Sequence, residues 1–194
     1  MNESDLDERL NFLQEIDKLK NVLRASPLVD KSRRENSAEH SWHLAMYALI
    51  LSDHSSETVD LGRVIKMLLL HDIVEIDAGD TPVHGNDSPA DQERKEQYAA
   101  KRLFGMLPNS EGKELRRIWL EFEAAETPDA RFAKALDRLQ PLLHNVATGG
   151  GTWADSDVSL QQVLQRYGPV IEAGSSELWN YAERLVKSHF EDVR

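Results

Sequence analysis

Residues 60–76 read DLGRVIKMLLLHDIVEI, and this stretch decides the fold. Its apolar residues recur at spacings of three and four, as on one face of an α-helix. Asp60 stands where its side chain can cap the amino end of that helix. His71 and Asp72 continue the apolar face at the carboxyl end, so both side chains are expected to point toward the interior. The stretch therefore predicts a helix that ends in two buried polar side chains.

The same helical spacing runs through most of the chain, and no window shows the alternation typical of strands. Helices are predicted at about residues 5–25, 37–54, 60–76, 88–106, 110–126, 128–147, 157–173 and 175–191. Two segments rich in turn-forming residues are predicted to be loops, DAGDTPVHGND at 77–87 and TGGGTWADS at 148–156. The predicted fold class is all-α, a single-domain helical bundle.

Composition excludes several classes of function. The chain has 194 residues, of which 40% are hydrophobic and 29% charged, as is ordinary for a soluble globular domain. It has no cysteine, which excludes disulfides, thiolate metal sites and a cysteine nucleophile. The formal net charge of −11 disfavours nucleic acid and anionic membranes as partners. The chain lacks an apolar run of about 18 residues and an N-terminal targeting signal, so a cytoplasmic location is expected.

Histidines at inward-facing positions form a second pattern. His40 lies on the apolar face of the helix predicted at 37–54, much as His71 and Asp72 do in theirs. On its own, a buried His–Asp pair is most simply explained by a hydrogen bond between the two side chains. A bound cation would compensate the imidazoles and the carboxylate together. His43 has the helical neighbours of an ordinary core histidine.

Asp137 is open to two interpretations. It lies off the apolar face of the helix predicted at 128–147, and this spacing alone predicts a solvated carboxylate. Pro141 favours a special role, because it lacks the N–H that would bond the carbonyl of residue 137 and should perturb the helix there. Two imidazoles and two carboxylates together would suit one Mn²⁺, Co²⁺, Fe²⁺, Ni²⁺ or Zn²⁺ ion, and Mg²⁺ less well because of the nitrogen ligands.

Four short motifs occur in an order typical of one family. They are Arg34-Glu35-Asn36-Ser37-Ala38-Glu39-His40-Ser41, His71-Asp72 followed by Glu75, Gly79-Asp80-Thr81-Pro82, and Asp137-Arg138-Leu139-Gln140-Pro141. With these motifs the chain resembles the HD-domain superfamily of metal-dependent phosphohydrolases. Within it, the chain is similar to the branch of the bacterial 5′-deoxynucleotidases and their HD-domain-containing relatives. The resemblance implies one HD domain over residues 1–194, with the metal-site core at about 12–147 and C-terminal helices at about 157–191.

The resemblance also implies roles for individual residues. The implied ligands of one divalent metal ion are His40, His71, Asp72 and Asp137. Glu75 would position or deprotonate the attacking water, and the alternative is that it only orients His71. Asp80 and Thr81 would contact the sugar of a nucleotide, although Asp80 could equally be a turn residue that bonds its own loop.

Arg24 matches the arginine that orients the phosphate in the resembling nucleotidases. That arginine is commonly followed by Trp, whereas Ala25 follows it here, which leaves base stacking and deoxyribose selectivity open. Arg33 and Arg34 lie close to the same motifs, and at least one of them is expected to be a surface charge.

These expectations combine into one predicted function. It is the metal-dependent hydrolysis of a phosphomonoester, best represented by a (deoxy)nucleoside 5′-monophosphate, through direct attack of water on phosphorus. The alternative is a catalytically idle, metal-binding scaffold that acts through protein association. Similar proteins also suggest a homodimer. The sequence does not distinguish the physiological metal, the sugar or the base.

Overall fold

The computed structural model describes residues 3–81 and 88–192 of the chain. Its long helices are α1 (Glu3–Ile16), α2 (Ser37–Leu51), α3 (Leu61–Leu70), α5 (Pro89–Phe104), α6 (Asn109–Ala124), α7 (Pro128–Ala147), α9 (Leu160–Gly174) and α10 (Ser176–Asp192). Its short helices are α4 (Glu75–Ala78), α8 (Thr152–Asp155) and the 3-10 turns η1 (Asp17–Asn21), η2 (Ser52–His54) and η3 (His71–Val74). The strands are β1 (Leu23–Pro27) and β2 (Arg34–Asn36). The prediction of an all-α fold is confirmed.

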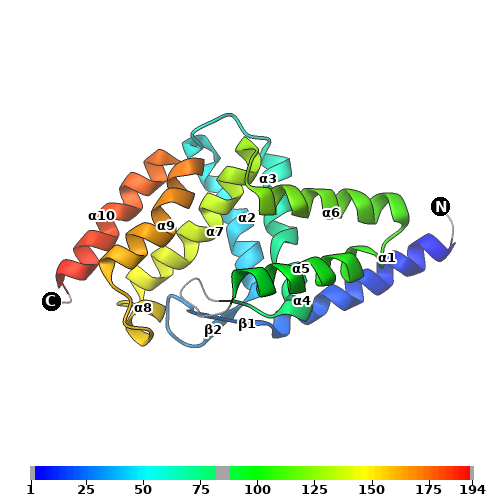
Figure 1. Cartoon of the computed structure of the whole chain (residues 1–194), viewed down its shortest axis with the longest axis horizontal. Coiled ribbons are helices and arrows are strands. Elements are labelled where there is room, and N and C mark those ends of the chain that lie inside the picture. The colour runs from blue at the N-terminus through cyan, green and yellow to red at the C-terminus, as the bar shows by residue number, and fades with distance from the viewer. Residues whose placement is uncertain (1–2, 82–87, 193–194) are drawn as a thin grey trace.

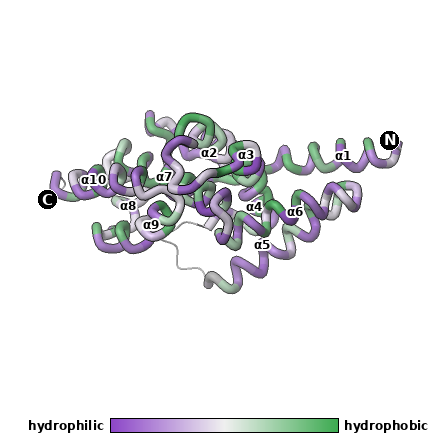
Figure 2. Tube along the Cα trace, turned by 90° about the horizontal axis from the view of Figure 1, so that it is seen from above, coloured by the Kyte–Doolittle hydropathy of each residue, from purple (hydrophilic) through white to green (hydrophobic). Residues whose placement is uncertain are grey.

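The helices form an elongated molecule in which α7 is central (Figure 1). Helices α7, α9 and α10 make up one end, α1, α5 and α6 extend toward the other, and α2 and α3 lie between them. Helix α7 packs against α2, α3, α6, α9 and α10. The most apolar segments run along α2 and α3 in the middle of the molecule (Figure 2). No helix in the described part of the chain is long and apolar enough to cross a membrane.

The N-terminal segment differs from its prediction. The helix expected at 5–25 ends at Ile16, and the chain continues through η1 into β1. The prediction that no segment forms a strand is therefore also wrong. Strands β1 and β2 pair antiparallel, with Leu23 opposite Asn36 and Pro27 opposite Arg34. Strand formation here depends on pairing between two segments, which the local spacing of residues does not record.

The stretch at 60–76 begins as predicted but does not remain one helix. The Asp60 side chain caps α3 by accepting a hydrogen bond from the backbone N–H of Arg63. Helix α3 ends at Leu70, and the chain tightens into η3 before α4 begins at Glu75. The Trp119 indole of α6 holds this turn by donating to the carbonyl of His71, at 3.2 Å. The break places His71 and Asp72 at the turn between two helices.

The predicted loops are found in part. Residues 148–156 form a connection, as expected, but it contains the single turn α8. Residues 77 and 78 are the last two residues of α4, and residues 79–81 begin a loop. The rest of that predicted loop, including Pro82, lies outside the described residues.

Candidate metal centre and pocket

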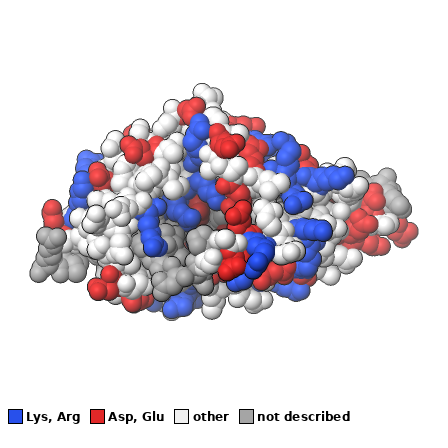
Figure 3. All heavy atoms as spheres, in the orientation of Figure 1, with Lys and Arg blue, Asp and Glu red and all other residues white. Residues whose placement is uncertain are grey.

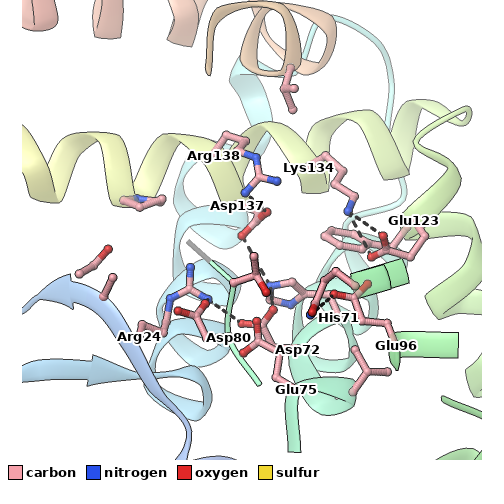
Figure 4. Close-up of a pocket in the computed structure, with 18 of the residues that line it drawn as sticks. Arg24, His71, Asp72, Glu75, Asp80, Glu96, Glu123, Lys134, Asp137 and Arg138 are labelled. Carbon is pink, nitrogen blue, oxygen red and sulfur yellow. Dashed lines mark hydrogen bonds and ion pairs between the residues drawn. The ribbon is translucent and has the colours of Figure 1, made fainter. Parts of the chain in front are cut away.

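Three separate parts of the fold bring the proposed ligands together. His40 lies in the first turn of α2, His71 and Asp72 lie in η3, and Asp137 lies in the middle of α7. The His40 Nε2 atom is 3.1 Å from Asp137 Oδ1, and the His71 Nε2 atom is 3.6 Å from the same oxygen. His71 Nε2 is also 2.9 Å from Asp72 Oδ1. All four side chains are buried, and Figure 4 shows His71, Asp72 and Asp137 pointing toward one another.

Local sequence fixes the direction of His40. Asn36 begins α2 with a capping box, in which its side chain accepts from the Glu39 N–H and the Glu39 carboxylate accepts from the Asn36 N–H. Ser37 is therefore the first helical residue rather than the cap, and its hydroxyl donates instead to Glu75 Oε2 at 2.6 Å. This arrangement sets the first turn of α2 against η3 and α4.

The spacing-based interpretation of Asp137 as a solvated carboxylate is wrong. Asp137 is only 6% exposed. Spacing distinguishes an inner from an outer face only when one side of a helix meets water. Because other helices pack on several sides of α7, positions off its most apolar stripe are buried as well, Ala133 and His144 among them.

The tautomer of His71 supplies a direct test of whether this site suits a cation. Its Nδ1 lies 2.8 Å from the carbonyl oxygen of Leu68, which can only accept, so Nδ1 carries the proton. In the neutral ring, Nε2 then presents a lone pair to the carboxylates of Asp72 and Asp137. This nitrogen is buried and lies 2.9 Å from Asp72 Oδ1, but it forms no hydrogen bond of good geometry with a described residue. A positive charge between these atoms would relieve their repulsion, so the donor set fits a divalent ion.

The ionisation of the same groups follows from their proximity. Burial alone would lower the pKa of His71, but Asp72 and Asp137 outweigh burial and raise that pKa to about 10. Burial alone would raise the pKa of Asp72, but His71 and Arg24 lower it to about 2. Despite its burial, the pKa of Asp137 is also held well below its usual value, by Arg138, His40 and His71. A metal ion that binds here must therefore displace a proton from His71.

Glu75 lies beside this centre with an unusual carboxyl group. Burial and the nearby Asp72 raise the pKa of Glu75 to about 9. A carboxyl group with so strongly raised a pKa in a pocket is a candidate for proton transfer. The alternative, that Glu75 orients His71, finds no support in this geometry, because the Leu68 carbonyl already occupies the other ring nitrogen of His71.

Arg24 reaches the centre from β1. Its Nη1 atom lies 3.0 Å from Asp72 Oδ2 and 3.6 Å from Asp80 Oδ1. Asp80 therefore faces β1, a strand from a distant part of the chain. Burial raises the pKa of Asp80, although Arg24 opposes the shift. Thr81 lines the same pocket.

The remaining arginines divide between pocket and surface. Arg33 is exposed and pairs with both carboxylate oxygens of Glu39 at 2.6 Å, so it is a surface charge, as expected for at least one of the pair. Arg34 lines the pocket.

This pocket is lined by Arg24, Asp72 and Glu75 on one side and by side chains of α7 on the other. The sequence did not single out the α7 side. Arg138 and Lys134 reach the pocket from α7, and Lys134 Nζ lies 3.2 Å from Glu123 Oε1 (Figure 4). Figure 3 shows basic and acidic side chains gathered around the hollow in the middle of this face. Their signal in the sequence is the spacing of four between Lys134 and Arg138, which places both on one side of α7.

Comparisons with known proteins identify the family of this chain. The model of a family named HD domain matches residues 16–179. The chain belongs to the HD-domain family. Among its HD-domain relatives, 5′-deoxynucleotidase HDDC2 of Danio rerio is 30% identical over 139 residues, which cover 71% of this chain and 68% of that protein. A 5′-deoxynucleotidase of Erwinia tasmaniensis is 28% identical over 168 residues, covering 79% of this chain and 82% of that protein.

A solved structure is similar to this HD-domain chain over nearly its whole length. It comes from Magnetospirillum magnetotacticum and is titled a predicted metal-dependent phosphohydrolase. It is 53% identical, with a TM-score of 0.92, and the match covers 97% of this chain and 94% of that one. The predictions of an HD-type helical bundle and of a hydrolytic enzyme of this family are confirmed, and the family implies a divalent metal ion.

Proposed function

We propose that the protein is a metal-dependent phosphomonoesterase that releases inorganic phosphate from (deoxy)nucleoside 5′-monophosphates. The observation that carries this proposal is the convergence at His71 Nε2, which is buried, forms no hydrogen bond with a described residue and faces two carboxylates. Support for the substrate class comes from the relatives named 5′-deoxynucleotidase.

The proposed ligands of the ion are His40, His71, Asp72 and Asp137. Two nitrogen and two oxygen donors suit Mn²⁺, Co²⁺, Fe²⁺, Ni²⁺ or Zn²⁺ better than Mg²⁺. When bound, such an ion lowers the pKa of a coordinated water and polarises a phosphoryl oxygen. Asp72 is held for this role from its other side by Arg24, which keeps the carboxylate ionised.

Glu75 is proposed to take the proton from the attacking water, in the ionised form that the positive charge of a bound metal ion would favour over the protonated form. The Ser37 hydroxyl, 2.6 Å from Glu75 Oε2, fixes the direction of the carboxyl group. Attack would form a bond between the water oxygen and phosphorus and break the bond from phosphorus to the 5′ oxygen of the sugar. The proton taken by Glu75 would then pass to this oxygen, so that the products are the nucleoside and inorganic phosphate. No covalent enzyme intermediate is needed, in keeping with the absence of cysteine from the chain.

Arg24 is proposed to bind the phosphate, with Asp80 and Thr81 near the sugar. The Arg24 guanidinium offers several N–H groups in a plane, a geometry that matches phosphate oxygens. Ala25 also lines the pocket and offers no ring on which a base could stack. Asp80 and Thr81 would supply polar contacts to the nucleoside.

Phosphate release from a panel of ribo- and deoxyribonucleoside 5′-monophosphates tests the proposal. The assay uses protein loaded with Mn²⁺ or Co²⁺, with metal content measured by elemental analysis. We expect turnover by the wild type and its loss in Glu75→Ala. A wild-type protein that holds metal but releases no phosphate would favour the scaffold alternative.

The proposal includes a homodimer formed through α2. Trp42, Met46, Leu49 and Ile50 recur at helical spacing on the outer side of this helix, and Trp42 and Ile50 are 61% and 72% exposed. Such a face can pack against its own copy about a twofold axis. Light scattering should give twice the chain mass for the wild type and the single mass for Ile50→Glu. A wild-type protein of single mass at high concentration would contradict the dimer.

A further inference from the structure

A second buried polar cluster lies behind the proposed metal centre. Its members are Glu35, His43, Gln140 and His144. The Gln140 Nε2 atom lies 2.9 Å from Glu35 Oε1, 3.2 Å from His144 Nε2 and 3.3 Å from His43 Nδ1. Glu35 is only 2% exposed, and Gln140 is fully buried. Charged groups are seldom buried this deeply without a specific partner.

Glu35 joins this cluster to His40. Its Oε2 atom lies 3.4 Å from His40 Nδ1 and 3.8 Å from Arg24 Nε. Glu35 Oε2 and His40 Nδ1 are both buried, and neither has a hydrogen-bond partner of good geometry among the described residues, although they lie 3.4 Å from each other. A ring N–H requires an acceptor and a carboxylate oxygen requires a donor, so these two atoms are suited to pair with each other.

We propose that Glu35 is a positioning residue that holds His40 in the tautomer needed for metal binding. With an ion bound, the carboxylate would accept from Nδ1–H and leave the lone pair of His40 Nε2 for the metal, in place of the hydrogen-bond contact that this nitrogen makes with Asp137 Oδ1 at 3.1 Å. Gln140 holds Glu35 in place by donating to its other oxygen. This inference rests on the proposed function, because it assigns a role at the same metal centre.

The two imidazoles of the centre are thus held by different groups. His71 is oriented by a neutral backbone carbonyl, that of Leu68. His40 is oriented by a carboxylate, which also makes the ring a stronger donor to a metal ion. A side-chain substitution can remove the Glu35 carboxylate but not the backbone carbonyl of Leu68. Glu35 is therefore the position at which the orientation of a metal-binding imidazole can be tested.

A second metal site is the competing explanation for the same cluster. Ligand-type atoms of Glu35, His43 and His144 all lie within 4.8 Å of one another. The amide nitrogen of Gln140, however, already lies between these three residues and contacts each of them. The structure therefore favours a hydrogen-bonded cluster over a second ion.

Titration with Co²⁺ distinguishes these possibilities, with the affinity and the number of ions per chain as readouts. We expect one Co²⁺ per wild-type chain and a Kd raised about 10- to 100-fold in Glu35→Gln. His43→Gln is the matched control, because His43 belongs to the cluster but makes no hydrogen bond to His40; its Kd should equal that of the wild type. The Co²⁺ absorption spectrum should keep its shape in both variants, since the ligands do not change.

A purely structural role for Glu35 predicts lower thermal stability with an unchanged Kd, and this result would overturn the inference. Binding of two ions, one of them lost in both Glu35→Gln and His144→Gln, would overturn it as well, because Glu35 would then be a ligand. If Glu35→Gln does not fold, Gln140→Met removes the donor that holds Glu35 and should also weaken Co²⁺ binding; an unchanged Kd there contradicts the proposal. Absence of binding by the wild type would instead refute the metal centre itself.

Discussion

The guanidinium of Arg24 lies 3.0 Å from the carboxylate of Asp72, although 48 residues separate them in the chain. The contact exists because the segment after η1 forms a strand and not the end of a helix. The contact places the Arg24 guanidinium, which is able to bind phosphate, directly beside the proposed metal centre. In a chain of net charge −11, the anionic substrate that we propose would need such a cation in the pocket.

Arg24→Ala should lower kcat/KM for a nucleoside monophosphate by about 10- to 100-fold, the value of a lost hydrogen bond between charged groups. It also leaves Asp72 and Asp80 without their shared cation. Steady-state kinetics with saturating Mn²⁺ measure the effect. Arg33→Ala is the control, because Arg33 is exposed and pairs with Glu39 at the surface. Equal kinetics for both variants would remove Arg24 from the phosphate site.

Glu75→Gln should lower kcat by about 10²- to 10⁴-fold, the usual contribution of a general base, while metal content stays at one ion per chain. The substitution keeps the size of the side chain and removes its ability to take a proton. Elemental analysis beside the kinetics separates this role from that of an orienting group. Loss of metal together with activity would indicate that Glu75 supports His71 instead.

The stability of the metal-free protein should fall as pH rises from about 6.5 toward 9. The pKa of His71 is about 10 in the folded protein, against ~6.5 in an unfolded chain, so its stabilising charge is fully present below pH ~6.5 and is lost as pH approaches 10. Glu75 acts in the same direction: its pKa is about 9 in the folded protein against ~4.3 in an unfolded chain, so it lowers stability progressively as pH rises through this interval. Asp72, with a pKa of about 2, changes only in strongly acidic solution.

Thermal unfolding in a chelator at pH 6.5, 7.5 and 9 checks this dependence. The melting temperature should decrease along the series, and added Mn²⁺ should raise it most at pH 9, where fewer protons compete for His71. A melting temperature of the chelated protein that is constant or rises over this range would contradict the pKa assignments.

Asn36→Ala should destabilise the protein by about 1 kcal/mol, because it removes the cap of α2. It should also weaken metal binding, since His40 lies in the first turn of that helix. Thr127→Ala is the matched control: it removes the cap of α7 at a similar cost, but Asp137 lies ten residues further along. Equal metal affinities for the two variants would show that the cap does not position His40.

The sequence predicted the burial of several residues of the candidate site because they lie on helices with one clear inner face. His40, His71 and Asp72 continue apolar stripes, and all three are buried. Asp137 could not be assigned in this way, because α7 is surrounded by other helices and its stripe does not mark a single inner face.

Two further features were hidden from local patterns. Strand β1 forms through pairing with β2, so the helical spacing before it suggested that α1 continues through Arg24. Glu35 belongs to a motif that pointed to the family, but its spacing assigns it no partner. Its contacts with His40 and Gln140 depend on the packing of α2 against α7.

The most direct test of the central claim is an anomalous-scattering crystal structure of the protein loaded with one equivalent of Co²⁺. One peak is predicted, about 2.0–2.2 Å from nitrogen atoms of His40 and His71 and from carboxylate oxygens of Asp72 and Asp137. A peak at Glu35, His43 and His144 in its place, or a Co²⁺ site without Asp137, would contradict the account.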